Sequence, residues 1–406
     1  MSAAKPKVAF VIQRYGEDIT GGSESHCRQV VERLLPWFDI EVLTSCGRDH
    51  LTWRNDYPAG VSEINGVLVR RFPSKSTRDL LHFHELYDQI FQRQLSRAEE
   101  FELIRRQGPD VPDLVDYVKA NHSRYDAFVC FTYLYYPVVH TLPLVARKAI
   151  FVPTAHDEAS LYVHLLDELF HATPYIFFNT EEEKHLLQKR FVLPERVGRV
   201  VGMGFEPPQP GGSATADWES LQASIAGKRL FTYVGRVENG KGCDELVDYF
   251  QRFKRQHDRD GDLTLLLLGR RTLPLPPDSS IVSPGYVSEY AKVQAVSRST
   301  IAVAPSPLES LCMAAMEAWM AGIPVLANGK SPVLVGHCLR SNGGLWYSSY
   351  EEFCEALKML LRDENLRAQL GAMGRLYVEQ NYRWDSVIAA YREVLNEIIM
   401  KAKNES

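Results

Sequence analysis

The sequence predicts an α/β protein built from two doubly wound domains. Short apolar runs of strand length alternate with longer helical patterns along the chain, as in parallel sheets covered by helices on both faces. Each half holds a complete set of such runs, and 406 residues are too many for one ordinary core. Residues 206–228 between the halves are rich in Pro, Gly, Ser and Ala, which is typical of a domain linker.

The predicted strands are short and mostly apolar throughout. In the first half they are KVAFVIQ, DIEVLTS, VLVRRF, DAFVCFT, AIFVPT and YIFFN, and in the second half RLFTYVG, LTLLLLG, SIVSPG, TIAVAPS and PVLANG. Ligands of open parallel sheets bind at the carboxyl ends of the strands. With two such sheets, we expect the functional site in a cleft between the domains, built from the segments that follow the strands.

The composition excludes several classes of protein. A net charge of −5 argues against a nucleic-acid binder that relies on positive charge. No apolar run reaches membrane-spanning length, and the run from Val8 to Ile12 has the length of a buried strand rather than of a signal peptide. The seven cysteines are scattered and never spaced C-x-x-C, so we expect reduced thiols in a cytoplasmic protein.

Two loops after predicted strands carry phosphate-binding features. Gly21 and Gly22 open a helix after the first strand, where backbone N–H groups and the positive helix end attract an anion. Arg236 and Lys241 follow the first strand of the second half and precede a helix, so they form a candidate diphosphate site. Plain turn chemistry and solvated surface cations are the alternatives.

Two glutamates interrupt the apolar stretch APSPLESLCMAAMEAWMAGIPVL. On a helix, Glu309 and Glu317 would lie about 12 Å apart along the axis and about 80° apart around it, too far to share a metal ion. A sugar nucleotide could reach both, with sugar hydroxyls at Glu309 and ribose hydroxyls at Glu317, because carboxylates accept hydrogen bonds from vicinal diols. The N–H groups of Ser310, Leu311 and Cys312 would then face the diphosphate. The alternative is an N-cap acid and a buried glutamate paired with a basic residue.

These motifs together resemble a known family. VGRVENGKG and the later PSPLESLCMAAMEAWMAGIPV resemble the C-terminal half of retaining GT-B glycosyltransferases of family four, the glycosyl transferases group 1. The TGGSE loop, the HD pair in FVPTAHDEAS and the terminal NYRWDSVIAAYREVLNEI extend the resemblance over nearly the whole chain. It implies two Rossmann-like domains that face each other across a cleft. They would be an acceptor-side domain over 1–205 and a donor-side domain over 206–382, with a C-terminal helix over 383–406 that crosses back to the first domain.

The resemblance also implies roles for matching residues. Arg236 and Lys241 would bind the donor diphosphate, Glu309 the transferred sugar and Glu317 the ribose. His156 would hydrogen-bond the donor sugar from the other domain, although a histidine at a strand end is often only structural. The predicted catalytic set is therefore Glu309, His156, Arg236 and Lys241.

Further residues would shape the donor pocket. The resemblance places Gly22, with Gly21 before it, close to the sugar phosphate. Many relatives have a glycine-rich stretch where this chain has Ser310-Leu311-Cys312. The bulk of these three side chains would narrow the pocket and leaves the donor sugar open.

A second departure is the segment NGKSPVLVGHCLRSNGGLWY. Its Lys330, His337 and Arg340 could reach a ligand, but we expect them to order this loop instead.

No metal and no other cofactor is expected, because the two cations of the diphosphate site take the place of a metal clamp. The acidic DRDGD, residues 258–262, precedes a strand and so belongs to the amino end of the sheet, far from the site. His82 and His84 stand two apart on a predicted helix and point to different faces. The helix predicted over 89–107 has four arginines and three glutamates, so peripheral membrane association is only weakly supported.

The prediction is a retaining, metal-independent glycosyltransferase that moves a sugar from a nucleotide-sugar donor to a hydroxyl of a glycan, a lipid-linked acceptor or a small molecule. No protein nucleophile is evident, which agrees with attack on the same face of the sugar, helped by the leaving diphosphate. Two alternatives stay open. A sugar-nucleotide epimerase would need acid and base groups near the sugar, where only His156 is well placed, and would turn over without an acceptor. A non-catalytic nucleotide-sugar binding protein would not need to stabilise a leaving group.

Overall fold

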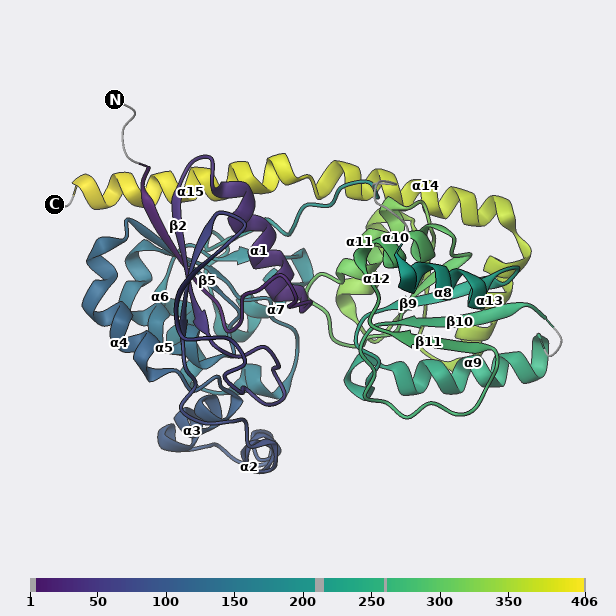
Figure 1. Ribbon diagram of the computed structural model, residues 1–406, viewed down its shortest axis with the longest axis horizontal. Helices are drawn as coiled ribbons and strands as arrows, with labels where there is room; N and C mark the ends of the chain where they lie inside the picture. The colour runs from purple at the N-terminus through teal and green to yellow at the C-terminus, as the bar shows by residue number, and fades with distance from the viewer. Residues whose placement is uncertain (1–4, 209–214, 259–260, 405–406) are drawn as a thin grey trace. The chain divides into compact units, whose positions relative to one another are not determined.

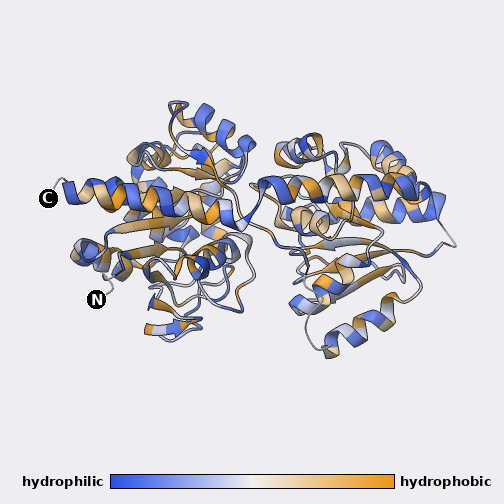
Figure 2. Cartoon of the chain, turned by 90° about the horizontal axis from the view of Figure 1, so that it is seen from above, coloured by the Kyte–Doolittle hydropathy of each residue, from blue (hydrophilic) through white to orange (hydrophobic). Residues whose placement is uncertain are grey.

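The computed structural model describes residues 5–208, 215–258 and 261–404. The chain forms two compact units, one from Met1–Met203 with Asp385–Ser406, and one from Gly204–Trp384. Each unit is built around its own six-stranded sheet. In Figure 2 the strands of both sheets are largely orange, whereas the surrounding helices alternate between orange and blue, as expected for helices with one buried face.

The sheet of the first unit has the strand order β3-β4-β2-β1-β5-β6. All neighbours are parallel except β3, which pairs antiparallel with β4 at the edge. The sequence did not predict β3 because every residue in GVSEI is at least partly exposed, so it lacks an apolar run. The strands are β1 (Lys7–Val11), β2 (Asp39–Ser45), β3 (Gly60–Ile64), β4 (Val67–Phe72), β5 (Ala127–Phe131) and β6 (Ala149–Val152), with a separate pair of β7 (Phe177–Phe178) and β8 (Arg199–Val200).

Helices cover both faces of this sheet, and Figure 1 shows α1 and α4–α6 on opposite sides of it. The helix predicted over 89–107 was too long at its start. A capping box between Ser96 and Glu99 begins α3 at Arg97 instead. The helices are α1 (Gly22–Leu34), α2 (Leu80–Tyr87), α3 (Arg97–Gln107), α4 (Pro112–Asn121), α5 (Tyr136–Val145), α6 (Leu165–Ala172) and α7 (Glu181–Phe191).

The second unit has a fully parallel sheet with the strand order β11-β10-β9-β12-β13-β14. Its central strands carry continuous apolar runs, because both of their faces are covered. The strands are β9 (Arg229–Val234), β10 (Leu263–Leu268), β11 (Ile281–Gly285), β12 (Ile301–Ala304), β13 (Val325–Asn328) and β14 (Gly344–Tyr347), and the helices are α8 (Ala216–Ile225), α9 (Cys243–His257), α10 (Glu289–Ser297), α11 (Met313–Met320), α12 (Pro332–Ser341), α13 (Tyr350–Arg362) and α14 (Glu364–Asn381).

Part of the predicted linker, residues 206–228, has a structural role in the second unit. Its helix α8 buries Trp218, Leu221 and Ile225 in a cluster that also contains Leu266. Residues 209–214 of the linker lie outside the described residues.

The last helix, α15 (Trp384–Asn404), returns to the first unit, as the resemblance implied. The Tyr391 ring meets the Phe177 ring edge to face at 4.9 Å, and Arg199 forms an ion pair of 2.9 Å with Glu393. Figure 1 shows α15, in yellow, lying along the unit that holds β2 and α1. Among the helices of the described residues, none combines the length and the apolar character needed to cross a membrane.

Candidate active site

The carboxyl edge of the second sheet brings Lys241 and Glu309 together. Lys241 ends the turn that follows β9, Glu309 lies in the loop that follows β12, and Lys241 Nζ is 2.8 Å from Glu309 Oε1. The two loops approach closely at Gly242, which has a φ of 69°. A Cβ atom there would lie 2.3 Å from the carbonyl oxygen of Pro305. Only glycine allows both this conformation and this approach.

The Lys241–Glu309 pair is partly withdrawn from water, with 27% of the lysine side chain and 15% of the glutamate side chain exposed. Burial alone would lower the pKa of Lys241, but the charge and the hydrogen bond of Glu309 outweigh burial and raise that pKa above its ordinary value. Lys241 is therefore a fixed cation across the neutral pH range, as a diphosphate site requires.

Arg236 lies in the same loop as Lys241 and is more accessible, with 46% of its side chain exposed. Its Nη1 atom is 3.0 Å from Glu238 Oε1, and its carbonyl oxygen accepts a hydrogen bond from the Tyr233 hydroxyl at 2.8 Å. The loop is thus tied to the end of β9 while the guanidinium reaches toward solvent. Arg236 also acts on the Lys241 ammonium by repulsion, which shows that the two cations share one neighbourhood.

The loop before α11 differs from the expectation. The helix begins at Met313, and Cys312 before it has the left-handed φ of 63°. Glu309 to Cys312 are not helical. The separation of about 12 Å between the two glutamates, which assumed one continuous helix, therefore does not describe this structure. Ser310 is half-buried, whereas Leu311 and Cys312 are buried in the second unit. The structure thus leaves Ser310 the most accessible of the three predicted donor contacts.

Glu317 faces a lysine that the sequence did not single out. Lys292 Nζ on α10 is 3.0 Å from Glu317 Oε1 and 2.9 Å from Glu289 Oε1. Burial raises the pKa of Glu317 above its ordinary value, and Lys292 opposes part of that rise. The side chain of Glu317 is still 28% exposed, so it is reachable by a ligand. Glu317 is therefore paired with a basic residue, as the alternative interpretation expected. This pairing is compatible with a role of Glu317 in ligand binding, because part of its side chain stays exposed.

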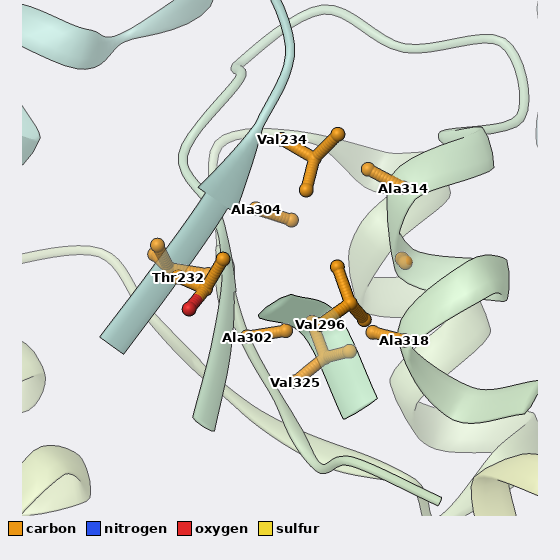
Figure 3. Close-up of a pocket in the computed structure, with 10 residues that line it drawn as sticks. Thr232, Val234, Val296, Ala302, Ala304, Ala314, Ala318 and Val325 are labelled. Carbon is orange, nitrogen blue, oxygen red and sulfur yellow. The ribbon is translucent and has the colours of Figure 1, made fainter. Parts of the chain in front are cut away.

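A small apolar cavity separates α11 from the sheet beneath it. Figure 3 shows Ala314 and Ala318 of α11 pointing toward Val234, Ala302 and Ala304 of the strands. Because it has no charged lining residue, this cavity fits neither a diphosphate nor a sugar. The small side chains let α11 approach the sheet closely.

Lys330, His337 and Arg340 all have partners inside the second unit. Lys330 Nζ donates to Glu245 at 2.6 Å. His337 Nε2 donates to the Leu311 carbonyl at 3.1 Å, and the Tyr377 hydroxyl donates to His337 Nδ1 at 3.0 Å. Arg340 Nε donates to the Tyr377 hydroxyl at 3.4 Å. His337 thus supports the loop that carries Glu309 and Ser310.

In the first unit, Gly21 caps α1 and Gly22 is its first residue. A Cβ atom on Gly21 would lie 2.1 Å from Glu24 Oε2. Glu24 is buried and pairs with Arg14 at 2.6 Å. Burial alone would raise the pKa of Glu24, but Arg14 and further hydrogen bonds hold it below the ordinary value. Neither member of this pair was predicted, because the two residues are ten positions apart and sequence spacing does not reveal their contact.

His156 follows β6 and is half-buried, with Nε2 3.7 Å from Glu158 Oε1. The loop is fixed from below by Glu183, which accepts hydrogen bonds from the N–H groups of Ala155 and Asn179, both at 2.5 Å. Burial raises the pKa of Glu183 to about 8, although both N–H groups oppose the rise. Glu183 was not predicted, since it reads as one of three acids opening a helix.

The acidic segment 258–262 lies before β10, at the amino end of the sheet. Asp258 and Asp262 pair with Arg229 there, while residues 259–260 lie outside the described residues. His82 pairs instead with Asp79 in the same helix region. Within the described ranges, no group of three or more His, Cys, Asp or Glu side chains is arranged to hold a metal ion.

Comparisons with known proteins agree with this architecture. Residues 218–377 match the family Glycosyl transferases group 1. An uncharacterized glycosyltransferase of Methanocaldococcus jannaschii is 22% identical over 416 residues, covering 94% of this chain and 95% of that protein. The fold is similar to sucrose-phosphate synthase from Thermosynechococcus elongatus (TM-score 0.71, 16% identity, 98% of this chain and 100% of that chain). It is also similar to an Anabaena protein in complex with UDP and glucose (TM-score 0.66, 13% identity, 97% and 100%).

Two Rossmann-like parallel sheets and a last helix that returns to the first unit define the GT-B fold. The match over 218–377 spans the loop of Arg236 and Lys241 and both glutamates of the second unit. Residues 218–377 carry the match to the glycosyl transferases group 1, the chain is a glycosyltransferase of the GT-B fold, and the resemblance drawn from its motifs is confirmed.

Proposed function

We propose that this glycosyltransferase transfers a hexose from a nucleotide-sugar donor to an acceptor hydroxyl without a metal ion. The observation that carries the proposal is the contact of 2.8 Å between Lys241 and Glu309, with Arg236 in the same loop. A diphosphate needs fixed cations, and a sugar needs carboxylate acceptors for its hydroxyl groups. The carboxyl edge of one sheet supplies both.

Each residue then has a defined task. Arg236 and Lys241 stabilise the charge that develops on the departing diphosphate. The Lys241 ammonium has three N–H donors, so it can hold Glu309 and a phosphate oxygen at once. Glu309 accepts from the hydroxyls of the transferred sugar, and Glu317 accepts from the ribose. His156 stays a predicted contact to the donor sugar.

The fold and the family support a nucleotide-sugar donor, and the similar Anabaena structure holds UDP and glucose. In the proposed reaction, the bond between the anomeric carbon and the diphosphate oxygen breaks as the acceptor hydroxyl attacks the same face. The diphosphate leaves with the electron pair of that bond and takes the hydroxyl proton. The protein contributes position and charge stabilisation rather than a nucleophile.

Calorimetric titration with UDP, GDP, ADP and dTDP tests the donor site. The native protein should bind at least one of these, and Lys241→Met should weaken that binding by about 10- to 150-fold, the loss of a charge-assisted hydrogen bond. Lys358→Met, which removes a lysine of α13 paired with exposed Glu355, is the matched control and should bind normally. Binding of none of the four nucleotides, or normal binding by Lys241→Met, would contradict the proposal. With the corresponding nucleotide sugar alone, conversion of the sugar without an acceptor would indicate an epimerase instead.

A further inference from the structure

A buried carboxylate ties together two strand ends of the first unit. Glu183 lies in the first turn of α7, and only 1% of its surface is exposed. Its Oε1 atom accepts a hydrogen bond from the Ala155 N–H, and its Oε2 atom accepts one from the Asn179 N–H, both at 2.5 Å. Ala155 follows β6 and directly precedes His156, whereas Asn179 directly follows β7. One side chain therefore fixes the backbone next to the predicted sugar contact.

Both hydrogen bonds together need the ionised form of Glu183. A carboxylate accepts through both oxygens, but protonation turns one oxygen into a hydroxyl group that needs an acceptor for its own hydrogen. Among the described residues, no lysine or arginine lowers the pKa of Glu183, and only the two N–H groups do so. Protonation of Glu183 therefore releases one of the two N–H groups from its acceptor.

Burial makes this ionisation depend on pH close to the neutral range. It raises the pKa of Glu183 to about 8, although the two N–H groups oppose the rise. No charged or titratable side chain on the surrounding elements contributes to this shift. These side chains are His156, Asp157 and Glu158 after β6, Asp167, Glu168 and His171 on α6, Arg199 on β8, and Glu181, Glu182, Lys184, His185, Lys189 and Arg190 on α7 itself. The hold on both N–H groups is therefore gained as the pH rises through about 8.

The segment that carries His156 has a strained backbone. Thr154 has a φ of 51°, in the left-handed region that a β-branched residue rarely adopts. Such a conformation persists only where its surroundings hold it, and it is concentrated at functional sites. Two contacts flank His156: Glu183 holds the N–H before it, and the Tyr133 hydroxyl donates to Glu158 at 2.5 Å after it. The position of the imidazole thus depends on these contacts to the interior of the unit.

We propose that ionised Glu183 is a positioning residue of the transfer reaction, because it holds the backbone at Ala155 in the conformation that places the His156 imidazole for contact with the sugar. Glu183 acts through the loop, since its own side chain is buried. The part of His156 in the reaction rests on the proposed function. The tie between Glu183 and the loop does not, because it rests on the two hydrogen bonds.

Hydrogen exchange of the full chain, followed by mass spectrometry at pH 7 and pH 9, tests the tie. After correction for the intrinsic pH dependence of exchange, residues 153–158 of the native protein should exchange about 10-fold faster at pH 7. The protonated fraction of a carboxyl group with a pKa of about 8 falls by about that factor between these two pH values. Glu183→Gln keeps the size of the side chain, but its amide nitrogen cannot accept an N–H. This variant should exchange fast at both pH values.

The catalytic consequence is measured as release of nucleoside diphosphate from UDP-glucose, GDP-mannose, ADP-glucose and dTDP-glucose, with water as the acceptor. Water attacks the anomeric carbon, and the diphosphate leaves with the electron pair of the broken bond and takes the proton. The kcat of the native protein should rise between pH 7 and pH 9. Glu183→Gln should lower kcat at pH 9 by about 10-fold and remove this rise, with the affinity for nucleoside diphosphate unchanged. Glu183→Asp, which keeps a carboxylate, should recover part of the rise.

Glu100→Gln is the matched control. Glu100 is a buried acid of the same unit, and its two oxygens accept hydrogen bonds from the N–H groups of His164 at 2.8 Å and Leu165 at 3.0 Å, at the start of α6. The control removes the same kind of contact from another element. It should leave both the exchange of residues 153–158 and the pH profile of kcat as in the native protein.

Equal corrected exchange of the native protein at the two pH values, or native-like exchange in a folded Glu183→Gln variant, would overturn the tie. If Glu183→Gln does not fold, the pH dependence of exchange in the native protein decides alone. A native-like kcat and pH profile in folded Glu183→Gln would overturn the positioning role. If the native protein binds nucleoside diphosphate but releases none from the four nucleotide sugars, the exchange measurements decide. Absence of nucleoside diphosphate binding would instead contradict the proposed function, and the exchange result for Glu183 would stand.

Discussion

The Nζ atom of Lys292 lies 3.0 Å from Oε1 of Glu317, and Nζ of Lys241 lies 2.8 Å from Oε1 of Glu309. Both glutamates that the sequence predicts to bind the donor are therefore held by a lysine from another segment of the second unit. In each pair the lysine engages one carboxylate oxygen. At Glu317, Lys292 opposes the rise in pKa that burial causes. In both pairs the second carboxylate oxygen stays available to accept hydrogen bonds from hydroxyl groups.

Lys292→Met should destabilise the second unit, and more so at high pH. Without Lys292, burial raises the pKa of Glu317 further above its value in the unfolded chain. A carboxyl group whose pKa is raised by folding loses stability as the pH rises above the unfolded value, because the native state then holds the extra proton. We expect a loss of about 1–3 kcal/mol at pH 8 and less at pH 5. Thermal unfolding at the two pH values measures it, and Lys358→Met should show no such difference. An equal loss of stability at both pH values would show that Lys292 does not affect the pKa of Glu317.

Glu309→Ala and Glu317→Ala should separate turnover from binding. If Glu309 accepts hydrogen bonds from the transferred sugar, these bonds strengthen as the anomeric carbon becomes positive in the transition state. Glu309→Ala should therefore lower kcat by roughly two to four orders of magnitude. If Glu317 grips the ribose, its contact is alike in the ground and transition states. Glu317→Ala should then weaken binding of donor and nucleoside diphosphate by about 1.5–3 kcal/mol.

Calorimetry with nucleoside diphosphate distinguishes the two glutamates, provided that circular dichroism shows both variants to be folded. Loss of nucleotide binding in Glu309→Ala with normal binding in Glu317→Ala would reverse the assignment. Normal binding and normal turnover in both variants would make the acids structural.

Activity should survive an excess of EDTA. Arg236 and Lys241 are fixed cations next to the expected diphosphate, and Lys241 stays protonated because Glu309 raises its pKa. Transfer rates before and after chelation measure this dependence. Complete loss of transfer with EDTA, restored by Mg²⁺ or Mn²⁺, would mean that a metal ion binds the diphosphate instead.

The two sheets were predictable because their buried strands are continuous apolar runs such as LTLLLLG. The strands that escaped prediction show the limit of that signal. β3 is an edge strand of the first sheet and has exposed side chains. β14 is an edge strand of the second sheet, and two of its four residues are not fully buried. An edge strand is defined by its neighbour, and a short stretch of sequence does not contain that neighbour.

The role of Lys241 and Glu309 in donor binding stays a prediction, but both were identifiable from the sequence as candidates because each is a charged residue that follows a strand, and the two strands are neighbours in the second sheet. Their partners were not. Lys292 meets Glu317 across 25 residues, and Glu183 meets Ala155 across 28. Such contacts depend on which helices become neighbours, so neither residue type nor spacing reveals them. The left-handed Cys312 was also hidden, because a non-glycine residue gives little sign of a positive φ.

His337→Phe should disturb the donor loop and remove part of the acid sensitivity of the second unit. His337 is buried, donates to the Leu311 carbonyl at 3.1 Å, and has its pKa lowered to about 3 by burial. A histidine whose pKa is lowered by folding contributes stability above its unfolded pKa of about 6.5, and that stability falls as the pH drops toward 3. The stability advantage of the native protein over His337→Phe should therefore shrink by about 2 kcal/mol between pH 7.5 and pH 5.

Because His337 is neutral at both values, the variant should raise the KM for the donor or lower kcat without shifting the pH profile of transfer. Tyr377→Phe keeps the His337 ring and removes the hydroxyl that donates to Nδ1 and accepts from Arg340, so as the matched control it should retain the acid sensitivity. A stability difference that does not change with pH would show that His337 does not titrate on unfolding as expected. Transfer kinetics identical to those of the native protein would show that His337 does not position the loop of Leu311.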